Sequence, residues 1–210
     1  MKKWTTLDTA LTPDGKTVAL IEHDGSYSIR IDNTELMSTR RHASEERIAQ
    51  LACRHAKRVL IGGLGFGFTL KAALAVLPDD ATVVVAEIMP EVVAWNQNPA
   101  YPLAADAMAD PRVTVLQRDV GDVIRESAAR FDSIVMDVDN GPAALSADSN
   151  ARLYDLAGLR LTRAALHPGG CAAFWSAATD PAFEKRMASA GFSVEVHRCR
   201  PHTIFLGTRA

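Results

Sequence analysis

The sequence predicts an α/β fold in which a small N-terminal β meander precedes a seven-stranded, mostly parallel sheet with an antiparallel last strand. From residue 58 onward, short apolar runs alternate with helical stretches, a pattern typical of a parallel sheet covered on both faces. A glycine-rich turn at residues 62–67 follows the first apolar run. The last two strands are joined by a short turn with Pro201, so they must pair antiparallel.

The N-terminal region differs in pattern from the rest of the chain. Apolar and polar residues alternate in short runs, and Asp24-Gly25 between two of them is a strong hairpin signal. Strands are expected at residues 17–22, 27–31 and 35–38.

A helix is expected to connect the meander to the rest of the chain. Ser44 is followed by two glutamates and is a plausible helix start, because a serine hydroxyl can satisfy free amide hydrogens there. The helix would extend to about His55. We therefore assign residues 1–57 to the meander and linking helix, and residues 58–210 to a nucleotide-binding domain.

The second region consists of βα repeats closed by a β hairpin. Buried strands are expected at 58–61, 82–86, 113–116, 133–136 and 171–175, and the hairpin at 193–197 and 202–206. Helices are expected at 69–77, 91–96, 120–129, 154–166 and 183–190, with a helix stop and turn at 167–170. Right-handed crossovers then give a doubly wound, Rossmann-like sheet. Dinucleotide-binding sheets normally lack the reversed last strand, so this topology favours an adenosyl-sulfonium ligand and disfavours an NAD-dependent dehydrogenase.

Composition narrows the classes of partner. Apolar residues make up 48% and charged residues 23% of the chain, and the formal net charge is -2, as in an ordinary soluble domain. No dense basic block indicates nucleic-acid binding, and no apolar run reaches the roughly 18 residues of a membrane span. The three cysteines follow no metal-ligand spacing. We expect a cytoplasmic protein with no metal site and no nucleic-acid or membrane partner.

The glycine turn is the first candidate binding element. Gly62, Gly63, Gly65 and Gly67 follow a strand and open a helix, the context that a nucleotide-binding glycine motif requires. Glycine permits unusual backbone angles and lets the main chain approach a ligand closely. The structural alternative is a tight strand-to-helix turn without a ligand.

Two acidic residues follow the next two strands. Glu87 ends the second strand, where a carboxylate can accept both ribose hydroxyls; the alternative is a solvent-facing strand end. Asp119 comes just after the third strand, beside the expected adenine pocket, where it can accept a hydrogen bond from the adenine amino group. Its alternative role is an N-cap of the following helix, and both roles are compatible.

A polar cluster follows the fourth strand. Asp137, Asp139 and Asn140 lie at the ligand edge, where an acidic group can hold a cation or an amine. A carboxylate can accept the proton of an amine while fixing its lone pair on an electrophilic carbon. The alternative is a loop-shaping turn, particularly for Asn140. His42, Tyr154 and Trp175 could border the same pocket, although a lone aromatic residue or histidine more often belongs to the core or the surface.

Several segments together resemble spermidine synthases and their relatives in the class I S-adenosylmethionine-dependent methyltransferase superfamily. The resemblance is carried by residues 59–67, 86–93, 110–113 and 131–137, and is extended by 153–154 and 166–170. It implies a decarboxylated S-adenosylmethionine donor, aminopropyl transfer to putrescine, and usually a dimer.

The chain differs from this family at positions that, in the family, determine the donor and the acceptor of the reaction. An aspartate in the glycine loop, which helps to bind the donor amine in the family, is replaced by Gly65. The tyrosine and the glutamine or histidine before Glu46 are replaced by Ser44 and Glu45, and Met37 stands in place of a glutamine of the preceding strand. A bare glycine backbone tolerates the carboxylate of S-adenosylmethionine, which an aspartate would repel, so the change favours methyl transfer.

The leading hypothesis is therefore a transferase that binds S-adenosylmethionine and methylates a small amine or similar nucleophile. Asp137 would orient or deprotonate the acceptor, with Asp139 and Glu46 attracting a cation and Asn140 and Tyr154 contacting the substrate. The alternatives are an aminopropyltransferase that uses decarboxylated S-adenosylmethionine, and a non-catalytic nucleotide-binding protein. A homodimer is expected by resemblance to the family.

Overall fold

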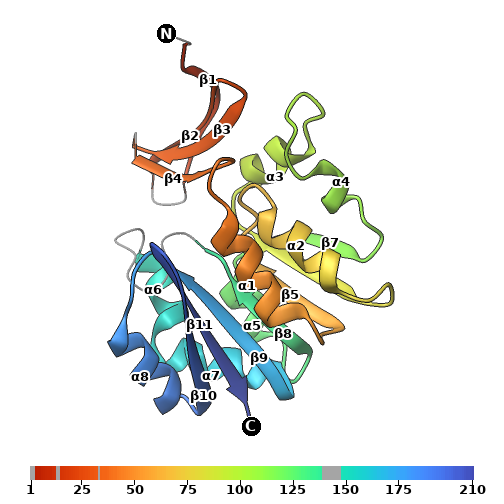
Figure 1. Ribbon diagram of the computed structural model, residues 1–210, viewed down its shortest axis with the longest axis vertical. Helices are drawn as coiled ribbons and strands as arrows, with labels where there is room; N and C mark the ends of the chain where they lie inside the picture. The colour runs from red at the N-terminus through yellow and green to blue at the C-terminus, as the bar shows by residue number, and fades with distance from the viewer. Residues whose placement is uncertain (1–2, 13–14, 33, 139–147) are drawn as a thin grey trace. The chain divides into compact units, whose positions relative to one another are not determined.

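The computed structural model describes residues 3–12, 15–32, 34–138 and 148–210 and has the predicted α/β architecture (Figure 1). By its internal contacts the chain divides into two compact units, residues 1–42 and residues 43–210.

The first unit is a four-stranded antiparallel sheet in the order β1-β2-β3-β4. Its strands are β1 (Thr5–Leu11), β2 (Thr17–His23), β3 (Ser26–Ile31) and β4 (Thr34–Ser38). Asp24 and Gly25 both have positive φ, 55° and 72°, as the two-residue hairpin turn predicted there requires. The sequence did not predict β1, because this strand is mostly exposed and so lacks a clear apolar alternation.

The second unit is built on a seven-stranded sheet in the order β10-β11-β9-β8-β5-β6-β7. Its strands are β5 (Arg58–Gly62), β6 (Thr82–Glu87), β7 (Val113–Gln117), β8 (Phe131–Met136), β9 (Leu166–Ser176), β10 (Phe192–Cys199) and β11 (His202–Arg209). The five strands β5 to β9 pair parallel, whereas β11 pairs antiparallel with both β9 and β10. The predicted reversal of the last strand is confirmed.

Helices lie on both faces of this sheet (Figure 1). They are α1 (Ala43–Cys53), α2 (Phe68–Val76), α3 (Pro90–Gln97), α4 (Ala105–Met108), α5 (Val120–Arg125), α6 (Asp148–Tyr154), α7 (Leu156–Ala165) and α8 (Pro181–Ser189). Helices α1 and α2 pack against each other on one face, and α5 packs against α7 on the other. None of the helices in the described part of the chain is long and apolar enough to span a membrane.

Helix α1 belongs with the second unit by its contacts. It packs against α2 and β9, and Ile48, Ala49 and Cys53 on its inner side are fully buried. Burial raises the pKa of the Cys53 thiol to about 12, as expected for a thiol in an apolar setting. The sequence-based boundary after residue 57 grouped this helix with the meander, because amphipathicity shows that a helix is half-buried but not which sheet it covers.

Two further segments differ from expectation. The predicted turn at residues 167–170 lies within β9, where the register with β8 shifts between Phe131 and Ser133, so the extra residues form an irregularity in the strand. The helix predicted at 154–166 begins at Leu156, because the side chain of Asp155 accepts a 2.7 Å hydrogen bond from the Gly158 amide and caps α7 there.

Candidate functional site

The carboxyl ends of the parallel strands gather the predicted donor-site residues at one edge of the sheet. Gly62 at the end of β5 is in register with Ala86 on one side and Met136 on the other, and Glu87 is in register with Gln117. The glycine turn, Glu87, the segment after β7 and the segment after β8 therefore begin side by side. This is the edge at which open α/β sheets bind ligands.

The glycine turn adopts backbone angles that side chains rarely allow. Gly63, Gly65 and Gly67 have φ of +89°, +50° and +71°, in the left-handed region. A Cβ on Gly63 would lie 2.2 Å from the Asp137 carbonyl oxygen, and one on Gly67 would lie 2.4 Å from the Ala104 Cβ. Glycine at these two positions lets the turn pass directly against the end of β8 and against the segment before α4.

Asn96 on α3 holds the glycine turn in place, a role that the sequence did not predict. Its Nδ2 donates to the carbonyl oxygens of Gly65 at 2.7 Å and Val92 at 2.8 Å, and its Oδ1 accepts from the Ala104 amide at 3.2 Å. The residue is 1% exposed, so these bonds satisfy an amide group whose burial would otherwise be costly. An asparagine in a predicted helix is weak evidence for such a role, because only the folded structure shows which carbonyl groups its side chain hydrogen-bonds.

Glu87 is fixed against the glycine turn. Its Oε2 accepts from the Leu64 amide at 2.9 Å and its Oε1 accepts from the Met89 amide at 2.8 Å, and the residue is 8% exposed. Each carboxylate oxygen thus bonds one main-chain amide. Because a carboxylate has about four acceptor positions, these bonds are compatible with the predicted contact to ribose hydroxyls, which stays a prediction.

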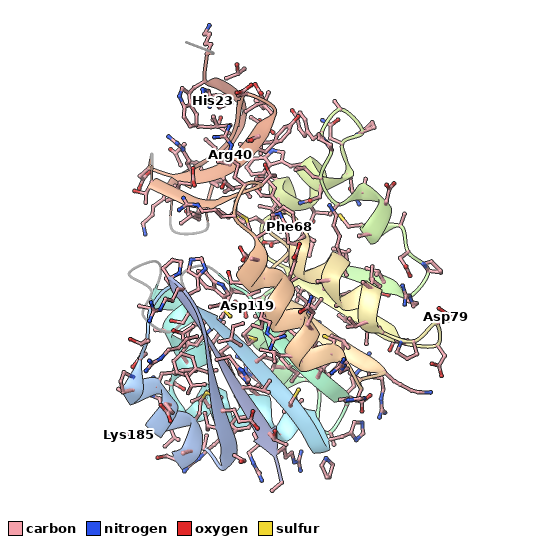
Figure 2. All side chains as sticks on the ribbon, viewed as in Figure 1. His23, Arg40, Phe68, Asp79, Asp119 and Lys185 are labelled. Carbon is pink, nitrogen blue, oxygen red and sulfur yellow. The ribbon has the colours of Figure 1, made fainter. Side chains whose placement is uncertain are left out.

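Asp119, which is labelled in Figure 2, has the capping role that was the alternative to adenine binding. Its Oδ1 accepts from the amides of Gly121 at 2.7 Å and Asp122 at 3.3 Å, which caps α5. Its Oδ2 forms an ion pair with Arg152 Nη2 at 2.8 Å. Both oxygens therefore have protein partners, and the predicted adenine contact stays a prediction.

Asp137 lies directly after β8 and beside the glycine turn. Its amide donates to the Gly62 carbonyl at 2.9 Å, and its Oδ2 accepts from the Thr69 hydroxyl at 2.5 Å. This places the predicted catalytic carboxylate next to the start of α2. The other two members of the predicted cluster, Asp139 and Asn140, lie outside the described residues.

The two remaining predicted substrate residues lie in different settings. Glu46 is half-buried on the first turn of α1. Tyr154 is buried, and its ring meets those of Phe174 and Phe183 edge to face at 6.2 and 5.8 Å. The Tyr154 hydroxyl donates to the Val138 carbonyl at 3.2 Å. Tyr154 therefore has a packing role in the core, and its predicted substrate contact stays untested.

A second polar cluster lies at the same edge and was not predicted as a group. The Ser44 hydroxyl contacts Glu45 Oε2 at 2.5 Å and His202 Nδ1 at 2.8 Å, and accepts from Trp175 Nε1 at 3.0 Å. Ser44 thus lies inside the first turn of α1 and its hydroxyl bonds side chains, whereas the sequence suggested a helix cap. Because Ser44 and His202 are 158 residues apart, no local pattern could have paired them.

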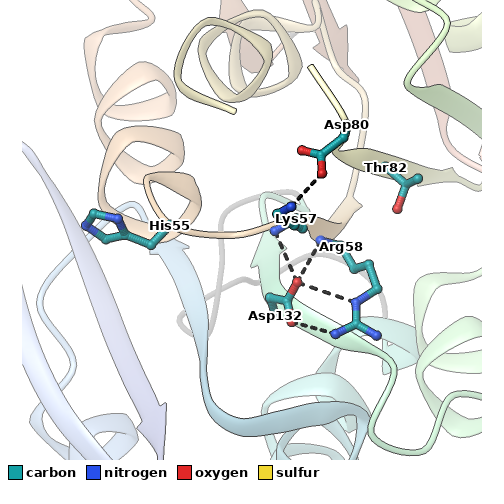
Figure 3. A pocket seen from close by; sticks show the side chains of 6 residues that line it. All are labelled: His55, Lys57, Arg58, Asp80, Thr82 and Asp132. Atoms are coloured by element: carbon teal, nitrogen blue, oxygen red, sulfur yellow. Dashed lines mark hydrogen bonds and ion pairs between the residues drawn. The ribbon is translucent and has the colours of Figure 1, made fainter. Parts of the chain in front are cut away.

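An open pocket of about 580 Å³ lies at the opposite edge of the sheet (Figure 3). It is lined by His55, Lys57, Arg58, Asp80, Thr82 and Asp132. Arg58 and Thr82 are the first residues of their strands, so this is the amino edge, away from the glycine turn.

The charges of this pocket are paired with one another (Figure 3). Lys57 Nζ lies 2.5 Å from Asp80 Oδ2, and Arg58 Nη2 lies 3.0 Å from Asp132 Oδ1. Partial burial raises the pKa of Asp132, but its hydrogen bonds to Arg58 and to the Lys57 amide outweigh burial and leave the pKa below its usual range. The ion pair between Arg58 and Asp132 connects the start of β5 to β8. We therefore assign these charged residues a structural role.

No protein-family model and no curated protein sequence matches the chain. Solved structures do match. A spermidine synthase in complex with the transition-state analogue AdoDATO is 15% identical with a TM-score of 0.76, covering 98% of this chain and 72% of that one. The spermidine synthase from Thermotoga maritima is 17% identical with a TM-score of 0.74, covering 98% and 73%.

A methyltransferase also matches, over less of the chain. An O-methyltransferase family protein from Burkholderia thailandensis is 13% identical with a TM-score of 0.58, covering 80% of this chain and 56% of that one. The chain therefore has a spermidine synthase-like class I S-adenosylmethionine-dependent methyltransferase fold, as the sequence resemblance predicted.

Proposed function

We propose that this chain is an S-adenosylmethionine-dependent transferase that methylates a small amine-type nucleophile. The observation that carries the proposal is the pairing of Glu87 with the glycine turn at the carboxyl edge of the sheet. Glu87 bonds the Leu64 amide within the turn, so the group proposed to hold the ribose and the backbone proposed to approach the donor form one fixed unit. When bound, the donor supplies an electrophilic methyl carbon on a sulfonium.

Gly65 favours the methyl donor over its decarboxylated form. S-adenosylmethionine carries a carboxylate that the decarboxylated donor lacks. Gly65, in the left-handed region, contributes only main chain to the turn, and its carbonyl is held by Asn96. A turn without an acidic side chain imposes no repulsion on a donor carboxylate at this place.

Asp137 is the acidic group proposed to attract and orient the acceptor. It is half-buried and hydrogen-bonded to Thr69, so its orientation is fixed while part of its surface faces outward. An ionised carboxylate in such a setting attracts an alkylammonium ion and directs one N–H bond toward itself.

Calorimetric titration of the protein with each donor tests this proposal. We expect S-adenosylmethionine to bind more tightly than decarboxylated S-adenosylmethionine, and Glu87→Gln to weaken binding at least tenfold, because it replaces a charged hydrogen-bond acceptor with a neutral one. Glu184→Gln, at an exposed position on α8, is the matched control and should leave the affinity unchanged. Tight binding of only the decarboxylated donor would overturn the choice of methyl transfer.

Aminopropyl transfer is the second candidate, favoured by the extent of the structural likeness. The spermidine synthases match 98% of this chain, including its N-terminal sheet, whereas the O-methyltransferase matches 80%. The same titration separates the two reactions. Labelled S-adenosylmethionine and labelled decarboxylated S-adenosylmethionine, each incubated with a cell metabolite extract and the protein, separate both reactions from a non-catalytic binding role, for which no fraction of the extract would acquire label from either donor.

A further inference from the structure

An ion pair joins the ends of two helices at the carboxyl edge of the sheet. Arg152 lies in the last turn of α6, and Asp119 is the N-cap of α5. Arg152 Nη2 donates to Asp119 Oδ2 over a distance of 2.8 Å. The side chain of Arg152 is 50% exposed, whereas that of Asp119 is 17% exposed. The carboxylate is therefore largely covered by protein, and the guanidinium that pairs with it is half in water.

The hydrogen bonds of Asp119 leave room for one more donor. A carboxylate has about four acceptor positions. Oδ1 accepts from the amides of Gly121 and Asp122, and Oδ2 accepts from Arg152. Within the described part of the chain, the position that remains belongs to Oδ2. An amino group of a ligand can therefore share this oxygen with Arg152.

Close packing between α5 and α6 fixes the place of Arg152. Leu153, the next residue along α6, is 5% exposed. A Cβ on Gly121 would lie 3.0 Å from Leu153 Cδ2 and 2.9 Å from Asp119 Oδ1, so glycine lets the two helices and the carboxylate approach one another closely. Arg152 thus belongs to a buried turn that packs on the helix that Asp119 caps.

Arg152 balances the charge of Asp119. The arginines in and just before α5 pair with other carboxylates: Arg125 Nη1 lies 2.6 Å from Asp122 Oδ1, and Arg118 Nη2 lies 2.7 Å from Glu126 Oε1. Among the residues that the structure describes, Arg152 is therefore the cation that pairs with Asp119.

This charge balance has a consequence when a ligand covers Asp119. An adenine base bonded to Oδ2, as predicted for the donor, would remove the remaining contact of the carboxylate with water. Burial of an ionised carboxylate is costly unless the charge is paired, and loss of one partner of a covered ion pair leaves an uncompensated charge. Arg152 lowers this cost, because its half-exposed guanidinium keeps part of its own hydration.

We propose that Arg152 is a positioning residue of the donor site, which holds Asp119 Oδ2 and balances its charge while the adenine amino group donates to the same oxygen. This rests on the function proposed above. The group that Asp119 recognises is then the exocyclic amino group of the base. A hypoxanthine base carries a carbonyl oxygen at that position, and this oxygen and the carboxylate repel each other. The site should therefore select an adenosine-containing ligand over its inosine counterpart.

Calorimetry with two stable probes, S-adenosylhomocysteine and S-inosylhomocysteine, tests the contact with the amino group. We expect the wild type to bind the adenosine compound at least about tenfold more tightly, because the inosine compound leaves the last acceptor position of Asp119 covered and unpaired. Equal affinities would overturn the proposal. If neither S-adenosylmethionine nor S-adenosylhomocysteine binds the wild type, the proposed function itself fails.

Variants of Arg152 test its charge. Arg152→Gln should weaken S-adenosylhomocysteine binding about fivefold or more, and Arg152→Lys, which keeps the positive charge, should lose less. Arg125→Gln is the matched control, because Arg125 is also half-exposed and ion-paired beside α5, and its affinity should equal that of the wild type. Unchanged binding in Arg152→Gln would overturn the role of Arg152. Tighter binding would do so as well, because it would mean that Arg152 competes with adenine for Asp119.

A double-mutant cycle separates charge balance from a purely structural role. Asp119→Asn has no carboxylate charge to balance, so the addition of Arg152→Gln should weaken S-adenosylhomocysteine binding no further. If Arg152 only held α6 in place, its loss would weaken binding equally in both backgrounds, and that result would overturn the positioning role. The melting temperature of each variant without ligand shows that it is folded. Binding of S-adenosylmethionine by the wild type, with the same affinity in Arg152→Gln, would reject the role of Arg152 and leave the proposed function standing.

Discussion

The main chain at Asp137 lies so close to Gly63 that a side chain at position 63 has no room. The turn passes so close to β8 that any side chain at Gly63 meets the Asp137 carbonyl. The position couples two parts of the proposed site, because the same carbonyl belongs to the residue proposed to orient the acceptor. A change here affects both the stability of the fold and the shape of the donor pocket.

We predict that Gly63→Ala destabilises residues 43–210 by about 2 kcal/mol or more, because it adds a steric clash to an unfavourable φ of +89°. Gly169→Ala is the matched control: φ is +79° but nothing lies within 4 Å of the added Cβ, so only the conformational cost of about 1 kcal/mol applies. Urea denaturation followed by circular dichroism measures both. Equal losses would show that the contact with Asp137 is not restrictive.

The positions of some residues near the proposed site could be predicted from the sequence, whereas those of others could not. The positions of Gly63 and Glu87 at neighbouring strand ends could be predicted, because strand ends and glycine spacing are local signals, and the fold places the glycine turn beside Glu87. Those of Asn96 and His202 could not, because they depend on contacts with Gly65 and Ser44 from distant parts of the chain. Polar contacts between distant parts of a chain produce no periodic pattern in the sequence, so they cannot be predicted from it.

At the scale of elements, Asp119 acts as a helix cap whose removal has a defined cost. Asp119→Ala leaves the first amides of α5 without their acceptor and should lower stability by about 1 kcal/mol. Asp180→Ala is the matched control, because Asp180 caps α8 through the amides of Ala182 and Phe183 at 3.0 and 2.9 Å. Chemical denaturation should show similar losses for both.

Calorimetry with S-adenosylmethionine then separates the two roles of Asp119. If the residue also contacts adenine, Asp119→Ala weakens donor binding while Asp180→Ala does not. Asp119→Asn keeps a capping oxygen and shows whether the carboxylate itself matters. Unchanged affinity in all three variants would contradict the adenine contact and leave capping as the role of Asp119.

The start of β7 is held by a paired arginine and aspartate. Arg112 Nε and Nη2 bond the two oxygens of Asp110 at 3.0 and 2.9 Å, and Arg112 Nη1 bonds the carbonyls of Leu77 and Pro78. The hydrogen bond from Arg112 holds the pKa of Asp110 at about 2, below its usual range. This part of the family-like segment therefore has a structural role, which the resemblance alone did not show.

Acid should remove the contribution of this pair. Because the pKa of Asp110 is lower in the folded than in the unfolded chain, the pair stabilises the fold above about pH 4 and loses its effect as the pH falls toward 2. We predict that Asp110→Asn lowers the melting temperature at pH 7 and that the difference from wild type vanishes near pH 2. Asp106→Asn, at an exposed position on α4, is the control, and a difference independent of pH would contradict the prediction.

At the scale of the molecule, the alternation of strands and helices made the sheet order predictable, since right-handed crossovers leave few topologies. The closing hairpin was predictable from the short turn between β10 and β11, and the structure confirms it. The sequence could not show that α1 groups with residues 43–210, because the packing of its apolar face against β9 is visible only in the folded unit.

The unit of residues 43–210 contains every described residue of the proposed site, so donor binding should stabilise this unit as a whole. At 100 times the dissociation constant, a ligand bound only by the folded form adds about 2.7 kcal/mol, which for a unit of this size raises the melting temperature by roughly 5–10 °C. We predict this rise with S-adenosylmethionine in scanning calorimetry. Glu87→Gln at the same donor concentration should show a smaller rise, whereas Glu184→Gln should match the wild type. An equal rise in all three proteins would mean that the donor binds somewhere other than beside Glu87.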